Sequence, residues 1–122
     1  NMVMYKIKYN KLFPFKGYIA MALFGRIWIR HENKDRVNPI TINHEAIHLE
    51  QQKELGILWF IILYCIEYIE KWFKYRNHKE AYRNIIFERE AYFNERNLNY
   101  LNIRKEFDFM NYNRKDYEYR YY

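Results

Sequence analysis

The spacing of hydrophobic and polar residues changes along this chain, and each spacing predicts a different element. Residues 1–17 show no regular spacing and predict an irregular arm. Beyond the arm, Ile27 and Ile29 alternate with arginine and tryptophan, the period of two that is typical of a strand. We expect one or two strands within residues 18–33, with Gly25 at a bulge or at a close approach of the backbone.

Helical spacing begins after a polar loop. Asn38 followed by Pro39 is typical of a helix start, because asparagine caps the first turn and proline fits the first helical position. This helix should end near Gly56, a typical C-terminal cap. A second helix over residues 57–75 is apolar all round in its first half, which predicts a buried helix. We expect a polar connection over 76–84, helices over 85–98 and 100–109, and a poorly ordered polar and aromatic tail over 110–122.

This order of elements predicts a single, mostly helical α+β domain over residues 1–109, with a short N-terminal sheet or hairpin. The chain of 122 residues suits one core. Its longest apolar run, Leu55–Ile66, is too short to cross a bilayer, so we expect this run and Cys65 inside the core. The alternatives for the run are contact with a membrane surface or with a hydrophobic partner.

Charge and cysteine content exclude several classes of protein. The net charge is +6, but lysine and arginine are interleaved with twelve glutamates and no nucleic-acid motif accompanies them, so we expect no nucleic-acid partner. A single cysteine excludes an internal disulfide and a cysteine-rich zinc module. Residues 1–17 lack the continuous apolar core and cleavage site of a signal peptide, which predicts a cytoplasmic protein.

The first predicted helix carries a motif with specific chemistry. His44 and His48 stand four residues apart, with Glu45 directly after the first of them. Residues four apart lie on one helical face, so both imidazoles can reach one tetrahedral zinc ion. The adjacent carboxylate can accept a proton from a water that zinc activates, which is the basis of HExxH sites. We therefore expect His44 and His48 as zinc ligands and Glu45 as general base; the alternative is two solvated histidines.

Such a site needs a third protein ligand and leaves one position for water. The pattern HExxHxxGxxH is excluded, because Gln51 and Glu54 stand where it has glycine and histidine. A later helix offers Glu88 and Glu90, which lie about 200° apart around its axis and cannot both bind one ion. Glu88 shares its face with Ala91, whose small side chain allows close helix packing. This favours Glu88, with Glu90 as the alternative or as the partner of a surface arginine.

HExxH followed by E-x-E-A and an aromatic residue on a second helix resembles the gluzincin-type zinc metallopeptidases, which include thermolysin-like enzymes and small minimal metallopeptidases. The resemblance covers about residues 38–97. It implies a zincin-like fold with Glu88 as the third ligand. It also implies a histidine brace at Tyr92, where the group usually has Asp or Asn. An edge strand, here residues 26–30, would lie above the motif helix and accept an extended peptide.

These observations predict a zinc-dependent metallopeptidase that cleaves a peptide or protein substrate, with Glu45 as general base. A non-catalytic zinc-binding regulatory or interaction module is the alternative, although a purely structural site would not need Glu45. Association with a membrane surface through Leu55–Ile66 is a third interpretation. Weaker candidates for supporting roles are Tyr82 and Tyr92 as oxyanion donors, His31 and His78 as transition-state donors, and Gln51 and Gln52, which we expect to be solvated.

Overall fold

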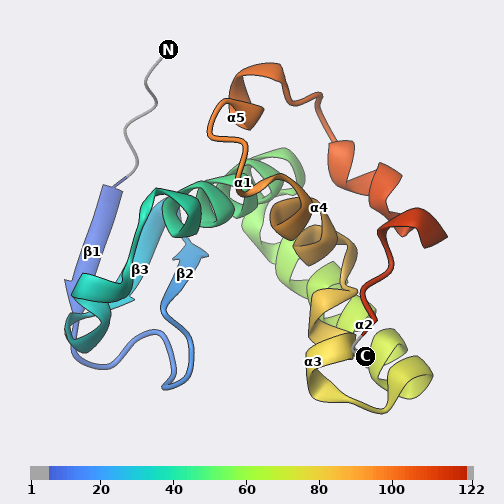
Figure 1. Ribbon diagram of the computed structural model, residues 1–122, viewed down its shortest axis with the longest axis horizontal. Coiled ribbons are helices and arrows are strands. Elements are labelled where there is room, and N and C mark those ends of the chain that lie inside the picture. The colour runs from blue at the N-terminus through green and yellow to red at the C-terminus, as the bar shows by residue number, and fades with distance from the viewer. Residues whose placement is uncertain (1–5, 121–122) are drawn as a thin grey trace.

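The computed structural model describes residues 6–120, which form a mostly helical α+β fold with a small sheet (Figure 1). The predicted fold class is therefore confirmed. The strands come first: β1 (Lys6–Asn10), β2 (Ala20–Leu23) and β3 (Arg26–Arg30). The helices follow: α1 (Pro39–Leu55), α2 (Ile57–Tyr75), α3 (His78–Arg83), α4 (Ile86–Asn94) and α5 (Tyr100–Ile103). Three 3₁₀ segments are η1 (His31–Arg36), η2 (Asp108–Asn113) and η3 (Lys115–Tyr117).

The sheet has the order β1-β3-β2, so β3 is central and β2 is an edge strand. β2 and β3 form an antiparallel hairpin within the stretch where one or two strands were predicted. Phe24 and Gly25 form its two-residue turn, both with positive φ, 54° and 71°, as a type I′ turn requires. Gly25 therefore serves the turn, and neither of its two predicted roles is correct.

The prediction of an irregular arm is wrong for residues 6–10. They form β1, which pairs with β3 in parallel. Ile7 and Tyr9 alternate with Lys6 and Lys8, a strand pattern too short and too polar to be recognised without its partner. The first five residues of the predicted arm lie outside the described part of the chain.

Helix α1 has the predicted caps. The Asn38 side chain accepts a hydrogen bond from the Thr41 amide at 3.0 Å, and Gly56, at φ 82°, donates its amide to the Gln52 carbonyl at 2.8 Å. The helix contacts β2, α2 and α4 and lies between the sheet and the other helices (Figure 1). This central position buries many polar residues of α1.

Helix α2 has the predicted bounds, but the prediction that its apolar first half is buried is wrong. Only Phe60 and Lys71 are buried; Leu58 is 67% exposed, and Cys65 is exposed as well. The helix packs through one side, where Phe60 contributes to a core cluster with Ile85, Phe87 and Phe109. No other element among residues 6–120 covers its outer side, so the apolar residues there face solvent. No helix in the described residues is long and apolar enough to cross a membrane.

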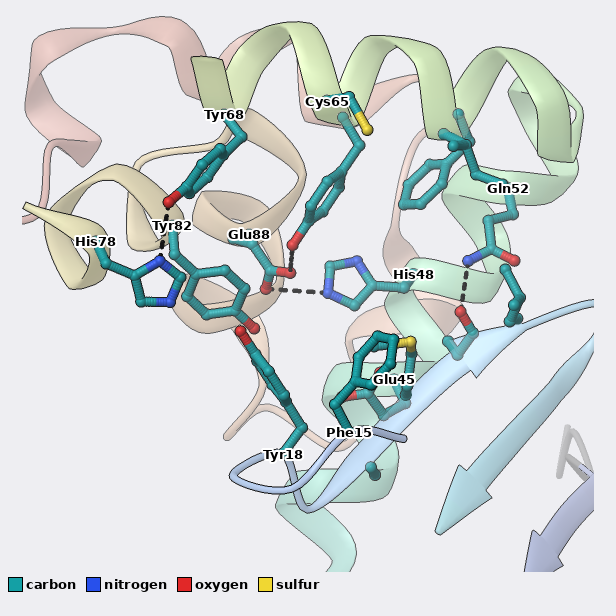
Figure 2. A pocket seen from close by; sticks show the side chains of 17 residues that line it. Phe15, Tyr18, Glu45, His48, Gln52, Cys65, Tyr68, His78, Tyr82 and Glu88 are labelled. Carbon is teal, nitrogen blue, oxygen red and sulfur yellow. Dashed lines mark hydrogen bonds and ion pairs between the residues drawn. The ribbon is translucent and has the colours of Figure 1, made fainter. Parts of the chain in front are cut away.

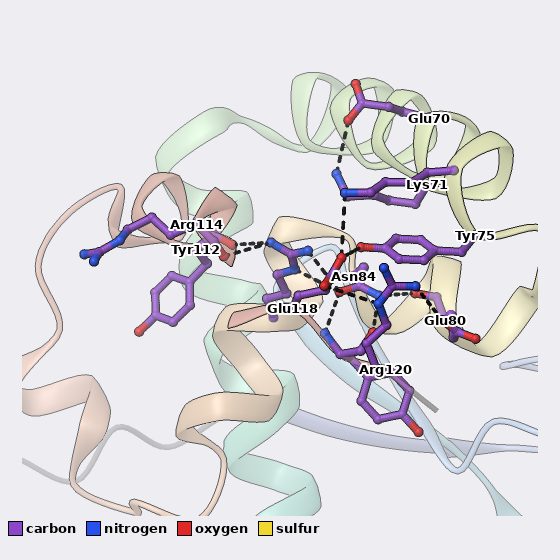
Figure 3. A network of polar contacts seen from close by, with 12 residues as sticks. Glu70, Lys71, Tyr75, Glu80, Asn84, Tyr112, Arg114, Glu118 and Arg120 are labelled. Carbon is purple, nitrogen blue, oxygen red and sulfur yellow. Dashed lines mark hydrogen bonds and ion pairs between the residues drawn. The ribbon is translucent and has the colours of Figure 1, made fainter. Parts of the chain in front are cut away.

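The predicted disorder of the tail is wrong for residues 110–120. The Asn84 side chain donates to the Tyr119 carbonyl at 2.8 Å and accepts from the Tyr119 amide at 2.7 Å. Arg89 donates to the Tyr112 carbonyl at 2.9 Å, and the Tyr75 hydroxyl donates to Glu118 (Figure 3). These long-range bonds hold the tail against α2, α4 and the end of α3. Residues 121–122 lie outside the described part of the chain.

The two last predicted helices are shorter than expected. The helix predicted over 85–98 corresponds to α4, which ends at Asn94. The helix predicted over 100–109 corresponds to the short α5. Beyond α5 the chain is no longer α-helical, and the Arg104 side chain forms a buried network of ion pairs. It contacts Glu90 and also Glu54, the latter through two bonds of 2.9 and 3.0 Å. Glu90 thus has the arginine partner we expected, but in the interior, where its carboxylate is fully buried.

Replacing Arg104 with alanine is expected to lower the free energy of unfolding by about 3–5 kcal/mol, because Glu90 would keep a buried charge without its counter-charge. Chemical denaturation followed by circular dichroism measures this loss. Lys53→Ala removes an exposed ion pair with Glu50 and is the control, with an expected change below about 1 kcal/mol. Similar small losses in both variants would contradict a stabilising role for the buried network.

Candidate metal centre

Helices α1 and α4 bring three potential metal ligands to one point. The Nε2 atoms of His44 and His48 lie 3.0 and 3.1 Å from the same Glu88 oxygen, and 3.2 Å from each other. All three side chains are buried, and their ligand atoms lie within 4.8 Å of one another. Figure 2 shows His48 and Glu88 pointing toward each other from the two helices. The structure thus places together the three residues that we expected as ligands.

The other ring nitrogen of each histidine is held by a partner in α1 or directly after α4. His44 Nδ1 donates to Glu95 at 2.9 Å, and His48 Nδ1 donates to the Gln51 side-chain oxygen at 2.8 Å. The Gln51 amide nitrogen in turn donates to Glu90 at 2.9 Å, which sets the orientation of its oxygen. Both bonds direct Nε2 toward Glu88, the arrangement by which outer partners orient metal-binding histidines.

These braces differ from the ones we expected. Tyr92 was the implied brace, but it contacts His44 through its ring, with centroids 4.4 Å apart, and Glu95 makes the hydrogen bond. Gln51 is fully buried and not solvated. Gln52 is buried too and donates to the Ala22 carbonyl at 2.8 Å, which ties α1 to β2. Two spacings in the sequence indicate these braces. Gln51 follows His48 by three residues and Glu95 follows Glu88 by seven, and both spacings are typical of one helical face.

Tyr64 is a site residue that the sequence did not reveal. It comes from the apolar run of α2 and donates its hydroxyl to the second Glu88 oxygen at 2.7 Å. This bond leaves the first Glu88 oxygen to face both histidines. Nothing in the sequence separates Tyr64 from thirteen other tyrosines, because its role depends on where α2 crosses α4.

Charge interactions dominate the protonation of the cluster. Burial lowers the pKa of His44, but hydrogen bonds to Glu88 and Glu95 and the Glu88 charge outweigh it and raise that pKa to about 10. Burial also lowers the pKa of His48, but the Glu88 charge and the hydrogen bond to Glu88 outweigh it, so that this pKa too is raised. Burial would raise the pKa of Glu88, but the two histidines hold it well below its usual range. Glu88 is therefore ionised, as a metal ligand must be.

Glu45 lies beside this cluster without belonging to it. Burial raises the pKa of its carboxyl group, and the charges of His44 and His48 only partly offset that effect. Its side chain lines a cavity of about 350 Å³ on the His48 side and a second one of about 460 Å³ on the His44 side. A buried carboxylate that faces both cavities is suited to exchange protons with a molecule bound across them.

The two cavities differ in lining. The first is mostly apolar and is lined by residues of β2 and α2 (Figure 2). Two of its lining residues, Phe15 and Ile61, are exposed. The second is more polar and includes Asn38, Thr41 and Arg96. Four residues line both: Tyr18, Ala20, Glu45 and Tyr82. The cavities therefore adjoin along the free edge of β2.

The remaining candidates lie at different distances from the centre. Tyr82 lines both cavities, Tyr92 lines the second, and His78 lines the first with its Nδ1 2.9 Å from the Tyr68 hydroxyl. His31 begins η1 and stacks on Tyr9, away from both cavities. The strand over residues 26–30 is the centre of the sheet, so the implied edge strand is wrong; β2 is the edge beside the site.

Two imidazoles and one carboxylate are a donor set that zinc uses in catalytic sites, where three protein ligands leave one position open. His44, His48 and Glu88 are the one such cluster found in residues 6–120. They fit zinc by donor type, convergence and bracing. No known protein family, curated protein or solved structure matches this chain. The chemistry of the centre follows from its residues alone.

Proposed function

We propose that this chain is a zinc-dependent metallopeptidase. The observation that carries the proposal is the convergence of His44, His48 and Glu88 from two helices, with the buried carboxylate of Glu45 between two cavities. A metal used only for structure would be enclosed by four protein ligands, whereas three ligands and an adjacent base are typical of hydrolytic centres. The resemblance to gluzincin-type enzymes supports the same assignment.

His44, His48 and Glu88 would hold the metal. Zinc, when bound there, lowers the pKa of water and polarises a carbonyl group. Glu45 accepts a proton at its carboxylate and passes it to the leaving amine. The raised pKa of Glu45 favours the first step, because a carboxylate that takes up a proton more readily is the better base. Tyr82 lines both cavities, as Tyr18 does, and is our candidate donor to a developing oxyanion.

The edge strand β2 supplies a surface for an extended peptide. In the hairpin, alternate residues of β2 direct their backbone groups away from β3. Ala22 is one of these, since its carbonyl accepts from Gln52. A substrate strand beside Ala20 would cross both cavities, with an apolar side chain in the cavity lined by Met21 and Phe60. We therefore propose peptides with a large apolar residue next to the cleaved bond as substrates.

A digest of a broad peptide library tests this function. Purified protein with one equivalent of zinc should cleave peptides next to large apolar residues, and a chelator should abolish cleavage. Re-addition of zinc should restore it. Cleavage that is insensitive to chelation would contradict a metal-dependent mechanism, and cleavage without any preference for apolar residues would contradict the substrate class.

The affinity for zinc is expected to rise with pH between about 6 and 9. The pKa of His44 in the metal-free protein is about 10, so its imidazole is protonated throughout this range and the proton competes with the metal. Each displaced proton raises the apparent affinity about tenfold per pH unit. Competition titrations with a zinc-binding dye at about pH 6, 7 and 8 measure the slope. An affinity independent of pH would contradict the protonated state of His44.

A further inference from the structure

Helix α2 presents a continuous apolar stripe to solvent. Leu58, Ile62, Ile66, Ile69 and Phe73 recur at spacings of three and four and so share one face of the helix. Each of them is exposed, from 37% for Ile62 to 67% for Leu58. Trp59 and Cys65 flank the stripe and are exposed too. An apolar surface of this length marks an interaction site, because solvated surfaces rarely keep one uncovered.

The stripe is continuous with the mouth of the apolar cavity. Ile61 and Cys65 lie one helical turn apart at the border of the stripe, and both line the cavity. Across the mouth, Phe15 lines the cavity from the loop between β1 and β2 while being 69% exposed. Leu12, three residues earlier, is 83% exposed. A partner that covers the stripe therefore also faces the mouth of the apolar cavity.

Basic charge is concentrated in the N-terminal part of the chain, which includes this loop. The first 31 residues contain six lysines and arginines and no acidic residue, so they account for the whole net charge of +6. Lys11 and Lys16 stand next to Leu12 and Phe15 in the same loop, and both are exposed. On α2, the acidic residues Glu67 and Glu70 are each contacted by Lys71.

We propose that this face docks on an anionic lipid surface, with the stripe of α2, Leu12 and Phe15 entering the interface. Lys11 and Lys16 would contact the lipid phosphates. Apolar side chains beside lysines are the combination by which peripheral proteins bind such surfaces. The cavity would then open toward the bilayer and take polypeptide segments at the membrane surface. This inference goes beyond the proposed peptidase function, and the docking does not depend on it.

Co-sedimentation with lipid vesicles tests the proposal on the full chain. Vesicles of phosphatidylcholine with about one third phosphatidylglycerol should bind the protein, and vesicles of phosphatidylcholine alone should bind it about tenfold less tightly or more weakly still. Raising the salt concentration should weaken binding to the anionic vesicles. No binding to anionic vesicles, or equal binding to both kinds, would overturn the proposal.

Paired variants separate the two contributions. Leu58→Ser with Ile66→Ser should weaken binding by about tenfold or more through lost apolar contact. Lys11→Gln with Lys16→Gln should weaken it by about tenfold for anionic vesicles only. Ile103→Ser and Lys105→Gln remove exposed residues outside this face and are the matched controls. Equal effects of the controls would overturn the assignment of this face, and circular dichroism checks that each variant is folded.

Cys65 is the single cysteine and allows a direct probe of the interface. An environment-sensitive fluorophore on Cys65 should shift to shorter wavelength when anionic vesicles are added, because its surroundings lose water. Light scattering without lipid tests the competing occupant, a second copy of the chain. A stable dimer that dissociates in Leu58→Ser with Ile66→Ser, together with an unshifted fluorophore, would assign the face to self-association and overturn the proposal.

Discussion

Replacing Glu45 with glutamine is expected to lower the rate of zinc-dependent peptide cleavage by about 10²–10⁴, the usual contribution of a positioned acid–base group. Glutamine keeps the shape of the side chain but cannot accept the proton. Glu45 is buried next to His44 and His48, and burial makes its carboxylate more basic than a solvated one. The measurement is the library digest, repeated with both proteins at matched zinc content.

The zinc content of Glu45→Gln should stay close to that of the wild type, because Glu45 is not part of the ligand cluster. Glu50→Gln, on the same helix and outside both cavities, is the matched control and should retain full activity. Cleavage at the wild-type rate in Glu45→Gln would contradict its role as base. Zinc binding without cleavage by either protein would favour the non-catalytic zinc-binding module.

Replacing Glu88 with alanine is expected to weaken zinc binding by more than about 100-fold. Loss of an outer partner of a ligand costs about 10–100-fold, and loss of a ligand itself should exceed that range. Only the two histidine nitrogens would remain of the cluster. Zinc per chain after dialysis, followed by competition titration, measures the loss.

Two further variants make the assignment of Glu88 specific. Glu88→Gln keeps an acceptor for the Tyr64 hydroxyl but replaces the carboxylate, and should lose zinc as well. Glu90→Gln keeps the shape of the other candidate, which lies in the Arg104 network, and should weaken zinc binding far less. Equal loss in Glu88→Gln and Glu90→Gln would show that the third ligand is wrongly assigned. Circular dichroism of the metal-free proteins controls for misfolding.

Local sequence determined much of the fold. The caps of α1 lie within a few residues of the bonds they make, so Asn38 and Gly56 marked both its ends correctly. The alternation of Ile27 and Ile29 marked strand β3 for the same reason, since side-chain period depends only on neighbouring backbone geometry. The mostly helical α+β class followed from these local patterns.

Burial was the property that local patterns predicted least well. An apolar run favours burial, but whether it is buried depends on what else the chain can place against it. The described residues place elements on one side of α2 only, so Cys65 and Leu58 face solvent. In the same way, the tail is ordered by Asn84, a residue 35 positions away from Tyr119. A polar segment is ordered where polar groups of distant residues form hydrogen bonds with its backbone.

For the metal centre, the sequence by itself determined that His44 and His48 share a face with Glu45 beside them, because the helical repeat sets this over five residues. It also favoured Glu88 by helical periodicity and by resemblance. The tertiary structure alone decided the rest. It placed Glu88 against both histidines and made Glu95, not Tyr92, the hydrogen-bond partner of His44. It also placed Tyr64 of α2 within hydrogen-bond distance of Glu88. These contacts join residues 24 to 51 positions apart, and their geometry depends on how whole helices pack, which no local repeat encodes.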